Sequence, residues 1–485
     1  EKVLDAVGEA VTKLRRELGE SLASLRKYDT NLQAATTSSL QALNAYSRGQ
    51  KISVEHGNPR PALPYYLHAI EIDPDFAMAY RAAGLAYASI GLQERAHDYQ
   101  TKAFELRQRT SDRERLSIEA AYYADVTGEL QKAAQVYLEL LDHYPNETME
   151  NLNLATIYSK LGDWHKGLEF ARRASPPLAH SRDYYLSGAE PMDHYQDAVK
   201  GMSQVQLEKI PEALYLLAFA DGDRENMARY LRLNGEGPSA RTLASDSEAY
   251  FGRVHTARAL VDEATAGNIS EDQSENGAIT LSVAAQWKAA YGNPAAGREM
   301  ATKAINLVPN SPSAGAEAAL AFALAGDTAR AESLAQDLEK RFPLDEQMHS
   351  IWLPAVRGQI ALNRKDPSKA LQVLGAPAQI EAGNIQFITN ATCLYTVYVR
   401  GNAYLAAGDG GAAATEFQRI TNRRGLVGNC WTGALARLGL ARAYAMQRDK
   451  VKAKAAYQDF LTLWKDADPD IPVLQQAKAE YAKLQ

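Results

Sequence analysis

Few residues of this chain stand at spacings that support catalysis or metal binding. Its nine histidines form no His-Glu-x-x-His or His-x-His pattern, in which two imidazoles would share one ion. Asp466, Asp468 and Asp470 alternate like the first ligands of a calcium loop. However, Ile471 occupies the place of the turn glycine in such a loop, and Ala477 that of the bidentate glutamate. We therefore predict no metal site and expect a solvated loop that closes the last structural repeat.

The two cysteines, Cys393 and Cys430, are too few for a four-ligand zinc site or for a disulfide-stapled mini-protein. Each one lies at the start of a predicted helix. We interpret them as two unpaired, partly buried thiols, and the alternative is a bridge between stacked repeats. Because neither has a histidine partner near it in the sequence, we predict no catalytic thiol.

Four arginines cluster with acidic residues between two predicted helices. They are Arg107, Arg109, Arg113 and Arg115, interleaved with Asp112 and Glu114. A phosphate-binding patch would use such arginines, but mixed charge is more typical of an exposed connector, and we adopt that interpretation. The chain contains no P-loop, no Gly-x-Ser-x-Gly elbow, and none of the kinase motifs His-Arg-Asp, Asp-Phe-Gly or the glycine-rich loop. The sequence therefore assigns no catalytic residue and no cofactor.

Length and charge narrow the class of protein further. The 485 residues, with a net charge of −6, are enough for about three domains or for one long repeat array. The charge is spread along the chain, which argues against a nucleic-acid footprint or a polybasic membrane surface. The longest apolar stretch, at 318–325, is about half of the ~18 residues that a membrane span needs. Because the chain begins with Glu1, we expect any signal peptide or anchor to lie upstream of it.

The sequence repeats with a period of about 34 residues, and this repeat predicts the helices on which the residues discussed above lie. It separates small and helix-breaking residues in several places: Ala62 and Ala96, Gly128 and Gly162, Gly292 and Gly326, and Pro309 and Pro343.

Within each period the pattern predicts two antiparallel helices. Tyr80, Ala83, Gly84 and Tyr87 lie on one helical face, and Gly91 suits the left-handed residue that ends this helix. The missing side chain at Gly84 lets the second helix approach closely. The same pattern recurs after residues 151, 315, 397 and 437. We predict an all-α fold, a right-handed superhelix of roughly ten or eleven tetratricopeptide (TPR) helical hairpins.

The regularity of the period divides the chain. We expect an amphipathic helix at 1–35, acting as a cap or as a junction to an upstream domain. A regular array follows at 36–175, and degenerate helical repeats with an irregular connector at 176–275. A second array with a C-terminal capping helix occupies 276–485.

Several runs along the whole chain resemble one bacterial family. They lie at 14–22, 42–46, 102–106, 397–401 (Val-Tyr-Val-Arg-Gly), 438–444 and 464–472. The family is the C-terminal TPR region of large acidobacterial-type serine/threonine protein kinases and related signalling proteins, some of which carry a winged-helix domain instead of the kinase. The resemblance implies a non-catalytic interaction or sensory scaffold. The alternatives are the C-terminal region of a kinase, or of a transcriptional regulator, whose effector domain lies upstream.

A partner of such an array would meet the inner wall that the first helix of each hairpin lines. Counting one or two residues beyond the core-facing position, and again a turn later, gives the predicted partner-binding residues: Arg81, Tyr122, Asp125, Tyr398, Asn402 and Arg442. We expect a protein or peptide ligand, with no nucleic-acid binding and no membrane insertion by this region.

Two further questions stay open at this stage. Leu152, Thr156, Ala316 and Leu320 stand where carboxylate-clamp TPR domains carry Lys and Asn, which argues against such a clamp. A small-molecule pocket in the degenerate segment 176–270 is an alternative. The sequence does not choose between the cytoplasm and the extracytoplasmic side of a membrane-anchored parent protein.

Overall fold

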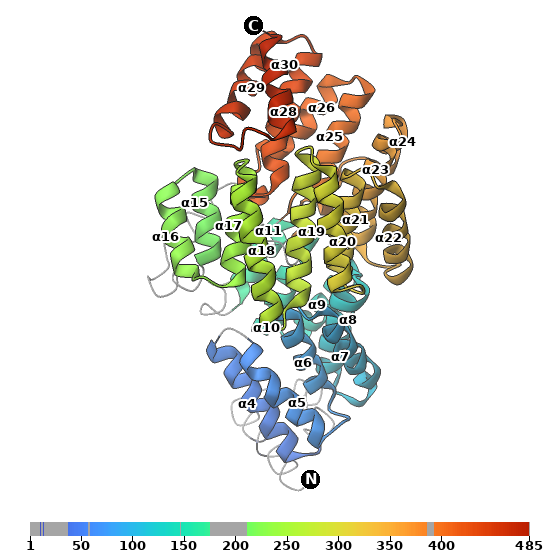
Figure 1. The fold of residues 1–485 in the computed structure, drawn as a ribbon. Coiled ribbons are helices and arrows are strands. Elements are labelled where there is room, and N and C mark those ends of the chain that lie inside the picture. Colours follow the sequence, from blue (N-terminus) through green and yellow to red (C-terminus); the bar gives the residue numbers. More distant parts are fainter. Residues whose placement is uncertain are drawn as a thin grey trace. The chain divides into compact units, whose positions relative to one another are not determined.

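A computed structural model describes residues 37–56, 59–145, 147–174, 211–385 and 392–484, together with the isolated residues Ala10 and Lys13. Apart from those two isolated positions, the predicted N-terminal helix at 1–35 lies outside the described residues, and so does most of the irregular connector. The chain forms two compact units, Glu1–Asn153 and Leu154–Gln485, and each is described by itself. Every regular element in the described ranges is helical (Figure 1).

The first unit consists of helical hairpins joined by short turns. The pairs are α4 (Leu40–His56) with α5 (Leu63–Ile72), α6 (Ala77–Ser89) with α7 (Gln93–Leu106), and α8 (Asp112–Tyr122) with α9 (Leu130–His143). A wide helical turn, η3 (Tyr123–Thr127), extends α8. The boundary between the two units falls inside α10 (Thr148–Lys160).

The second unit continues the pairing. After α11 (Trp164–Arg173), its hairpins are α15 (Pro211–Asp221) with α16 (Arg224–Asn234), α17 (Pro238–Tyr250) with α18 (Val254–Ser270), α19 (Ser274–Ala290) with α20 (Pro294–Leu307), α21 (Pro312–Leu324) with α22 (Thr328–Arg341), α23 (Leu353–Asn363) with α24 (Pro367–Leu374), α25 (Tyr395–Ala407) with α26 (Gly410–Thr421), and α28 (Trp431–Met446) with α29 (Lys450–Leu463). The short elements η4 (Met348–Trp352), η5 (Gln379–Ala382) and α27 (Arg424–Val427) join hairpins, and α30 (Pro472–Ala482) follows the hairpin of α28 and α29.

These pairs confirm the predicted all-α fold, a TPR-like array of helical hairpins. In the segment 211–275, where degenerate helical repeats are expected, the structure has the helices α15 to α18, with a turn at Gly222. None of the described helices combines the length and the apolar character needed to cross a bilayer.

The turns follow from two adjacent residues in the sequence. Gly162, Gly326 and Gly408 have φ values of 75°, 76° and 82°, a left-handed conformation that ends a helix without the steric cost of a Cβ atom. The next residue is an aspartate in each case, and its carboxylate accepts the backbone N–H three residues later, which caps the second helix. The predicted turn glycines are confirmed, whereas the aspartate caps were not anticipated.

Close packing of the paired helices depends on small residues. A Cβ atom on Gly84 would lie 2.9 Å from Gln100, and one on Gly439 would lie 2.5 Å from the Phe417 ring. The repeat tyrosines face the core as expected at Tyr87 and Tyr158, which are buried.

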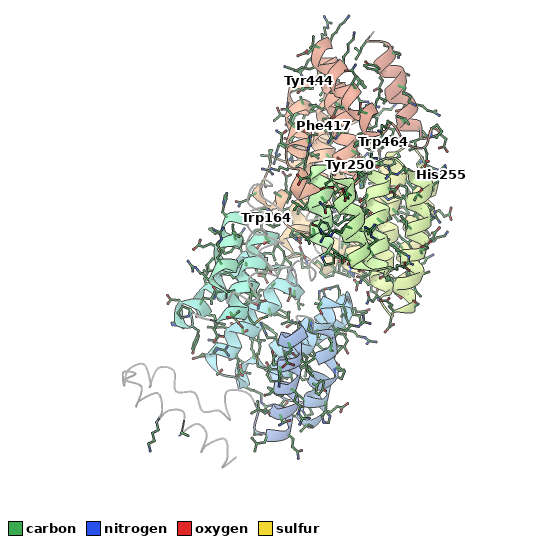
Figure 2. The ribbon with its side chains drawn as sticks, turned by 90° about the vertical axis from the view of Figure 1, so that its left-hand side faces the viewer. Trp164, Tyr250, His255, Phe417, Tyr444 and Trp464 are labelled. Carbon is green, nitrogen blue, oxygen red and sulfur yellow. A yellow bond between two sulfur atoms is a disulfide. The ribbon has the colours of Figure 1, made fainter. Side chains whose placement is uncertain are left out.

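The last hairpins of the second unit contact its earlier ones. The indole Nε1 of Trp464, after α29, donates to the carbonyl of Tyr250 at 2.9 Å (Figure 2). The N–H of Val473 in α30 donates to the carbonyl of Tyr291 at 3.2 Å. The acidic stretch is a solvent-exposed loop, as expected, and it is also tied to α18, because Asp468 accepts the backbone N–H of His255 at 2.9 Å.

The segment between α24 and α25 makes a second long-range contact within this unit. The indole of Trp164 donates to the carbonyl of Ala382 at 2.9 Å. Glu381, the residue before Ala382, forms an ion pair with the buried guanidinium of Arg400 at 2.8 Å. The same guanidinium pairs with Glu416 at 3.1 Å. Partnered charges of this kind hold η5 in one position on α25 and α26.

Candidate functional site

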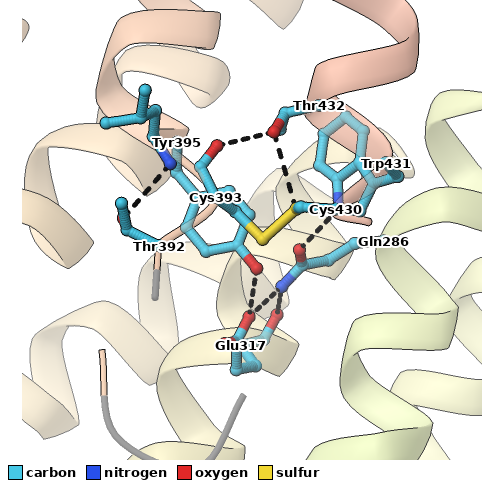
Figure 3. The surroundings of a disulfide bond; sticks show 9 residues. Gln286, Glu317, Thr392, Cys393, Tyr395, Cys430, Trp431 and Thr432 are labelled. Carbon is cyan, nitrogen blue, oxygen red and sulfur yellow. Dashed lines mark hydrogen bonds between the residues drawn. A yellow bond between two sulfur atoms is a disulfide. The ribbon is translucent and has the colours of Figure 1, made fainter. Parts of the chain in front are cut away.

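A disulfide joins the starts of two neighbouring first helices in the second unit (Figure 3). Cys393 precedes α25 and Cys430 precedes α28, and their Cα atoms are 5.6 Å apart. The side chains are 1% and 3% exposed. The interpretation of these residues as unpaired thiols is therefore wrong. The helices α25 and α28 are in contact, and this proximity brings the two cysteines within bonding distance.

The residues beside the two cysteines reach a common hydrogen-bond network. Tyr395, two positions after Cys393, donates its hydroxyl to Glu317 Oε2 at 3.1 Å. Trp431, the neighbour of Cys430, donates its indole N–H to Gln286 Oε1 at 3.1 Å. The Gln286 amide in turn donates to the Glu317 carboxyl group. The network thus links α19, α21, α25 and α28, as Figure 3 shows.

Glu317 is the electrostatically unusual member of this network. Burial raises the pKa of its carboxyl group to about 8, and hydrogen bonds from Gln286 and Tyr395 offset only part of that rise. Its Oε1 atom has no partner in the described residues. The group therefore carries its proton at neutral pH, so that no unpaired charge is buried. At 1% exposed, Glu317 serves as a structural hydrogen-bonding group, and no substrate could reach it.

A small hollow lies beside the disulfide. Its lining comes from α17, α19 and the starts of α25 and α28: Asp246, Ala249, Val283, Trp287, Cys393, Asn429, Cys430 and Trp431. The empty space is about 270 Å³ and includes open solvent, whereas pockets for drug-sized ligands enclose roughly 300–1,000 Å³. Only Asp246 and Ala249 of this lining belong to the segment 176–270, so the hollow is not the small-molecule pocket considered for that segment, part of which lies outside the described residues.

Three of the predicted partner-binding residues come together in the second unit. Burial raises the pKa of Tyr398 in α25. The hydrogen bond with Asn402, one turn later in the same helix, and the positive charge of Arg442 in α28 each lower this pKa, but by less than burial raises it. Glu480 of α30 accepts from Arg442 at 2.9 and 3.0 Å, and also from the hydroxyl of Tyr457 at 2.9 Å. Tyr398 is buried, while Asn402 and Arg442 are partly exposed.

The other three predicted residues lie in the first unit, where Arg81 and Asp125 both lie close enough to influence the pKa of the buried Tyr137. Arg81 is buried, and its Nε atom donates to the carbonyl of Ser117 at 3.2 Å. Tyr122 stacks on Phe104 with ring centroids 4.0 Å apart, so it packs between α7 and α8. Asp125 lies in the wide turn η3.

The arginine cluster agrees with its interpretation as mixed charge. Arg107 pairs with Glu119 at 3.2 Å, and Arg113 pairs with Glu147 at 2.6 Å. Both pairs join neighbouring elements of the first unit. Because the glutamates offset the charge of these arginines, the cluster would attract a phosphate less strongly.

The sequence analysis missed Glu317 and Gln286. The available signal was one acidic residue among the small and apolar residues 314–324 of α21, where burial of a carboxyl group without a partner would be costly.

Comparisons with known proteins identify no relative by sequence. No protein-family model matches the chain, and no curated protein matches it.

Solved structures of low similarity do match. The crystal structure of yeast Tom70 is 14% identical, with 84% of this chain and 95% of that chain covered and a TM-score of 0.30. The TPR domain of P58(IPK) is 12% identical, with 91% and 98% covered and a TM-score of 0.22. The Cut9–Hcn1 hetero-tetramer of the APC/C is 15% identical, with 92% and 90% covered and a TM-score of 0.30. Similarity this low carries no argument about function, and the fold assignment rests on the hairpins themselves.

Proposed function

We propose that this chain is a non-catalytic protein-interaction scaffold of a bacterial signalling protein, which binds a peptide or protein segment on the inner wall. The observation that carries the proposal is the arrangement of Tyr398, Asn402 and Arg442 on two neighbouring first helices. Tyr398 of α25 interacts with Asn402 in the same helix and with Arg442 of α28, and Asn402 and Arg442 are partly exposed.

These groups suit the main chain of an extended peptide. A carboxamide such as that of Asn402 both donates and accepts hydrogen bonds, as a peptide group does. Glu480 holds the Arg442 guanidinium through two hydrogen bonds and neutralises its charge. An arginine whose charge is already paired attracts a free carboxylate less strongly, so we expect it to bind a carbonyl oxygen of the ligand. This agrees with the absence of the Lys and Asn residues of a carboxylate clamp from the sequence.

We extend the proposal to the first unit, where Tyr122 and Asp125 are half-buried and able to contact a ligand. Arg81 acts there by fixing its neighbours, because its side chain is buried against Ser117 and near Glu150.

The signalling context rests on the family resemblance. The sequence upstream of Glu1 in the gene tests it: a glycine-rich loop with His-Arg-Asp would identify a kinase parent, and a winged helix with a basic recognition helix would identify a regulator.

The binding proposal is tested with peptides selected by display on residues 1–485 and measured by calorimetry. We expect Asn402→Ala to weaken the affinity about tenfold, because it removes hydrogen bonds to the ligand main chain. The matched control is Gln336→Ala, which removes an exposed amide on the second helix α22 and should leave the affinity unchanged. Equal affinities for Asn402→Ala, Arg442→Gln and the unmodified chain would refute the proposed surface.

A further inference from the structure

We propose that the Cys393–Cys430 disulfide is a permanent structural bond, formed as the chain folds in an oxidising compartment, and that it fixes the inner wall. This deepens the proposed function by naming what holds the binding surface and on which side of a membrane that surface works. The part that concerns partner binding rests on the proposed function, whereas the bond and the compartment do not.

The fold brings the two cysteines together and shields their sulfur atoms from solvent. These two cysteines are the only ones in the chain, so no alternative pairing competes. Their Cα separation of 5.6 Å lies in the usual range for disulfides. Reduction requires a thiolate to reach one of the sulfur atoms, and both side chains are almost fully buried.

The backbone next to the bond is independent evidence for a fixed structure. Leu394 adopts a left-handed conformation with φ 49° and ψ 45°, which is uncommon and unfavourable for a leucine. Such a conformation persists only where the surroundings determine it. Here the disulfide holds the preceding residue, and α25 begins at the following one. The hydroxyl of Thr432 also donates to the carbonyl of Cys393 at 2.6 Å.

The bond connects the core network with the proposed binding residues. Tyr395 and Trp431 anchor the two linked segments to Glu317 and Gln286. The Trp431 ring also packs edge-on against Tyr398, with centroids 5.1 Å apart. Without the covalent link, the starts of α25 and α28 could separate, and Tyr398 would lose its support.

Formation of the bond needs an oxidant. The two thiols lose two protons and two electrons, and a disulfide of a small molecule or an oxidoreductase accepts them and becomes a pair of thiols. Compartments that maintain such an oxidant lie outside the cytosol, where reductants keep thiols free. Of the two locations that the sequence left open, the bond therefore favours the extracytoplasmic side.

The first test uses the full parent protein in its native cells, with free thiols alkylated before lysis and counted by mass spectrometry. We expect both cysteines to be unmodified and joined. Alkylated Cys393 and Cys430 would overturn the proposal.

The second test measures whether the bond is permanent, using purified residues 1–485 and the reductant glutathione. We expect no labelling of either cysteine in the folded protein, and full labelling once concentrated urea unfolds it. Rapid reduction of the folded protein would overturn permanence and indicate a switch.

The third test separates this proposal from the binding proposal. The double variant Cys393→Ala/Cys430→Ala should melt about 10 °C lower than the oxidised chain. An unchanged melting temperature would show that the bond does not hold the wall. If the melting temperature falls but the unmodified chain binds no selected peptide, the binding proposal fails and the structural role of the bond stands.

Discussion

At the scale of single residues, Glu317 shows how a buried acid is made tolerable. Its carboxyl group accepts hydrogen bonds from Gln286 and Tyr395, and burial keeps it protonated at neutral pH. Since the unfolded chain would release that proton near its ordinary pKa of 4.5, folding takes up a proton at intermediate pH. The stability of the second unit must therefore depend on pH through this residue.

The sign of that dependence follows from the raised pKa. The contribution of Glu317 is fully present below pH 4.5 and is lost progressively as the pH rises to about 8. We expect Glu317→Gln, which resembles the neutral acid, to be more stable than the unmodified chain at about pH 8 by up to several kcal/mol. Urea unfolding followed by circular dichroism from about pH 5 to pH 9 measures the difference.

The control for this prediction is Glu299→Gln in α20, an exposed glutamate whose pKa the neighbouring Lys303 lowers. It should not reproduce the gain in stability at high pH. If Glu317→Gln kept the pH dependence of the unmodified chain, the assignment of a neutral Glu317 would be incorrect.

At the scale of elements, the hairpins are defined by local residues but are tied together by distant ones. Glycine ends the first helix of a hairpin and aspartate caps the second, as at Gly162 and Asp163. The cap of α18 is different, because Asp468 supplies it from the loop before α30. A helix of one hairpin is thus completed by a residue more than two hundred positions away.

The cap that Asp468 supplies to α18 predicts a measurable contribution to stability. We expect Asp468→Ala to lower the free energy of unfolding by about 1 kcal/mol, because the first turn of α18 loses its hydrogen-bond acceptor. Guanidinium unfolding of purified protein provides the value. Asp466→Ala, an exposed change in the same acidic stretch, should cost less, and an equal loss for the two variants would argue against a specific cap.

At the scale of the whole molecule, α30 covers the hairpin of α28 and α29. Leu474 and Ala477 bury one face of this helix, and Glu480 binds both Arg442 and Tyr457. In a repeat array each hairpin has an apolar side that a neighbouring element must cover, and α30 does so for this hairpin.

Removal of residues 472–485 should therefore lower the melting temperature clearly more than the single change Glu480→Gln. The truncation exposes apolar surface as well as breaking hydrogen bonds, whereas the substitution changes only the polar contacts. Differential scanning calorimetry of the three proteins tests the order. Equal melting temperatures for the truncated and the complete chain would mean that α30 does not stabilise the array.

The hairpins could be predicted from the sequence because their signals are local. Gly84 and Gly91 act on helices a few residues away, and the same residue types return once per hairpin. Individual helices such as α6 and α7 follow from this repetition. The prediction of Tyr398, Asn402 and Arg442 as partner-binding residues also starts from the repeat, and their role in binding stays a prediction.

Only the tertiary structure decided which hairpins meet beyond their immediate neighbours. The cap that Asp468 supplies to α18 and the contact of Trp464 with Tyr250 join segments more than two hundred residues apart, whereas the pairing of Cys393 with Cys430 joins neighbouring hairpins. The residues that form such contacts carry no periodic signal. The physical reason is geometric: small rotations between successive hairpins accumulate along the array, and their sum determines which distant side chains come within bonding distance.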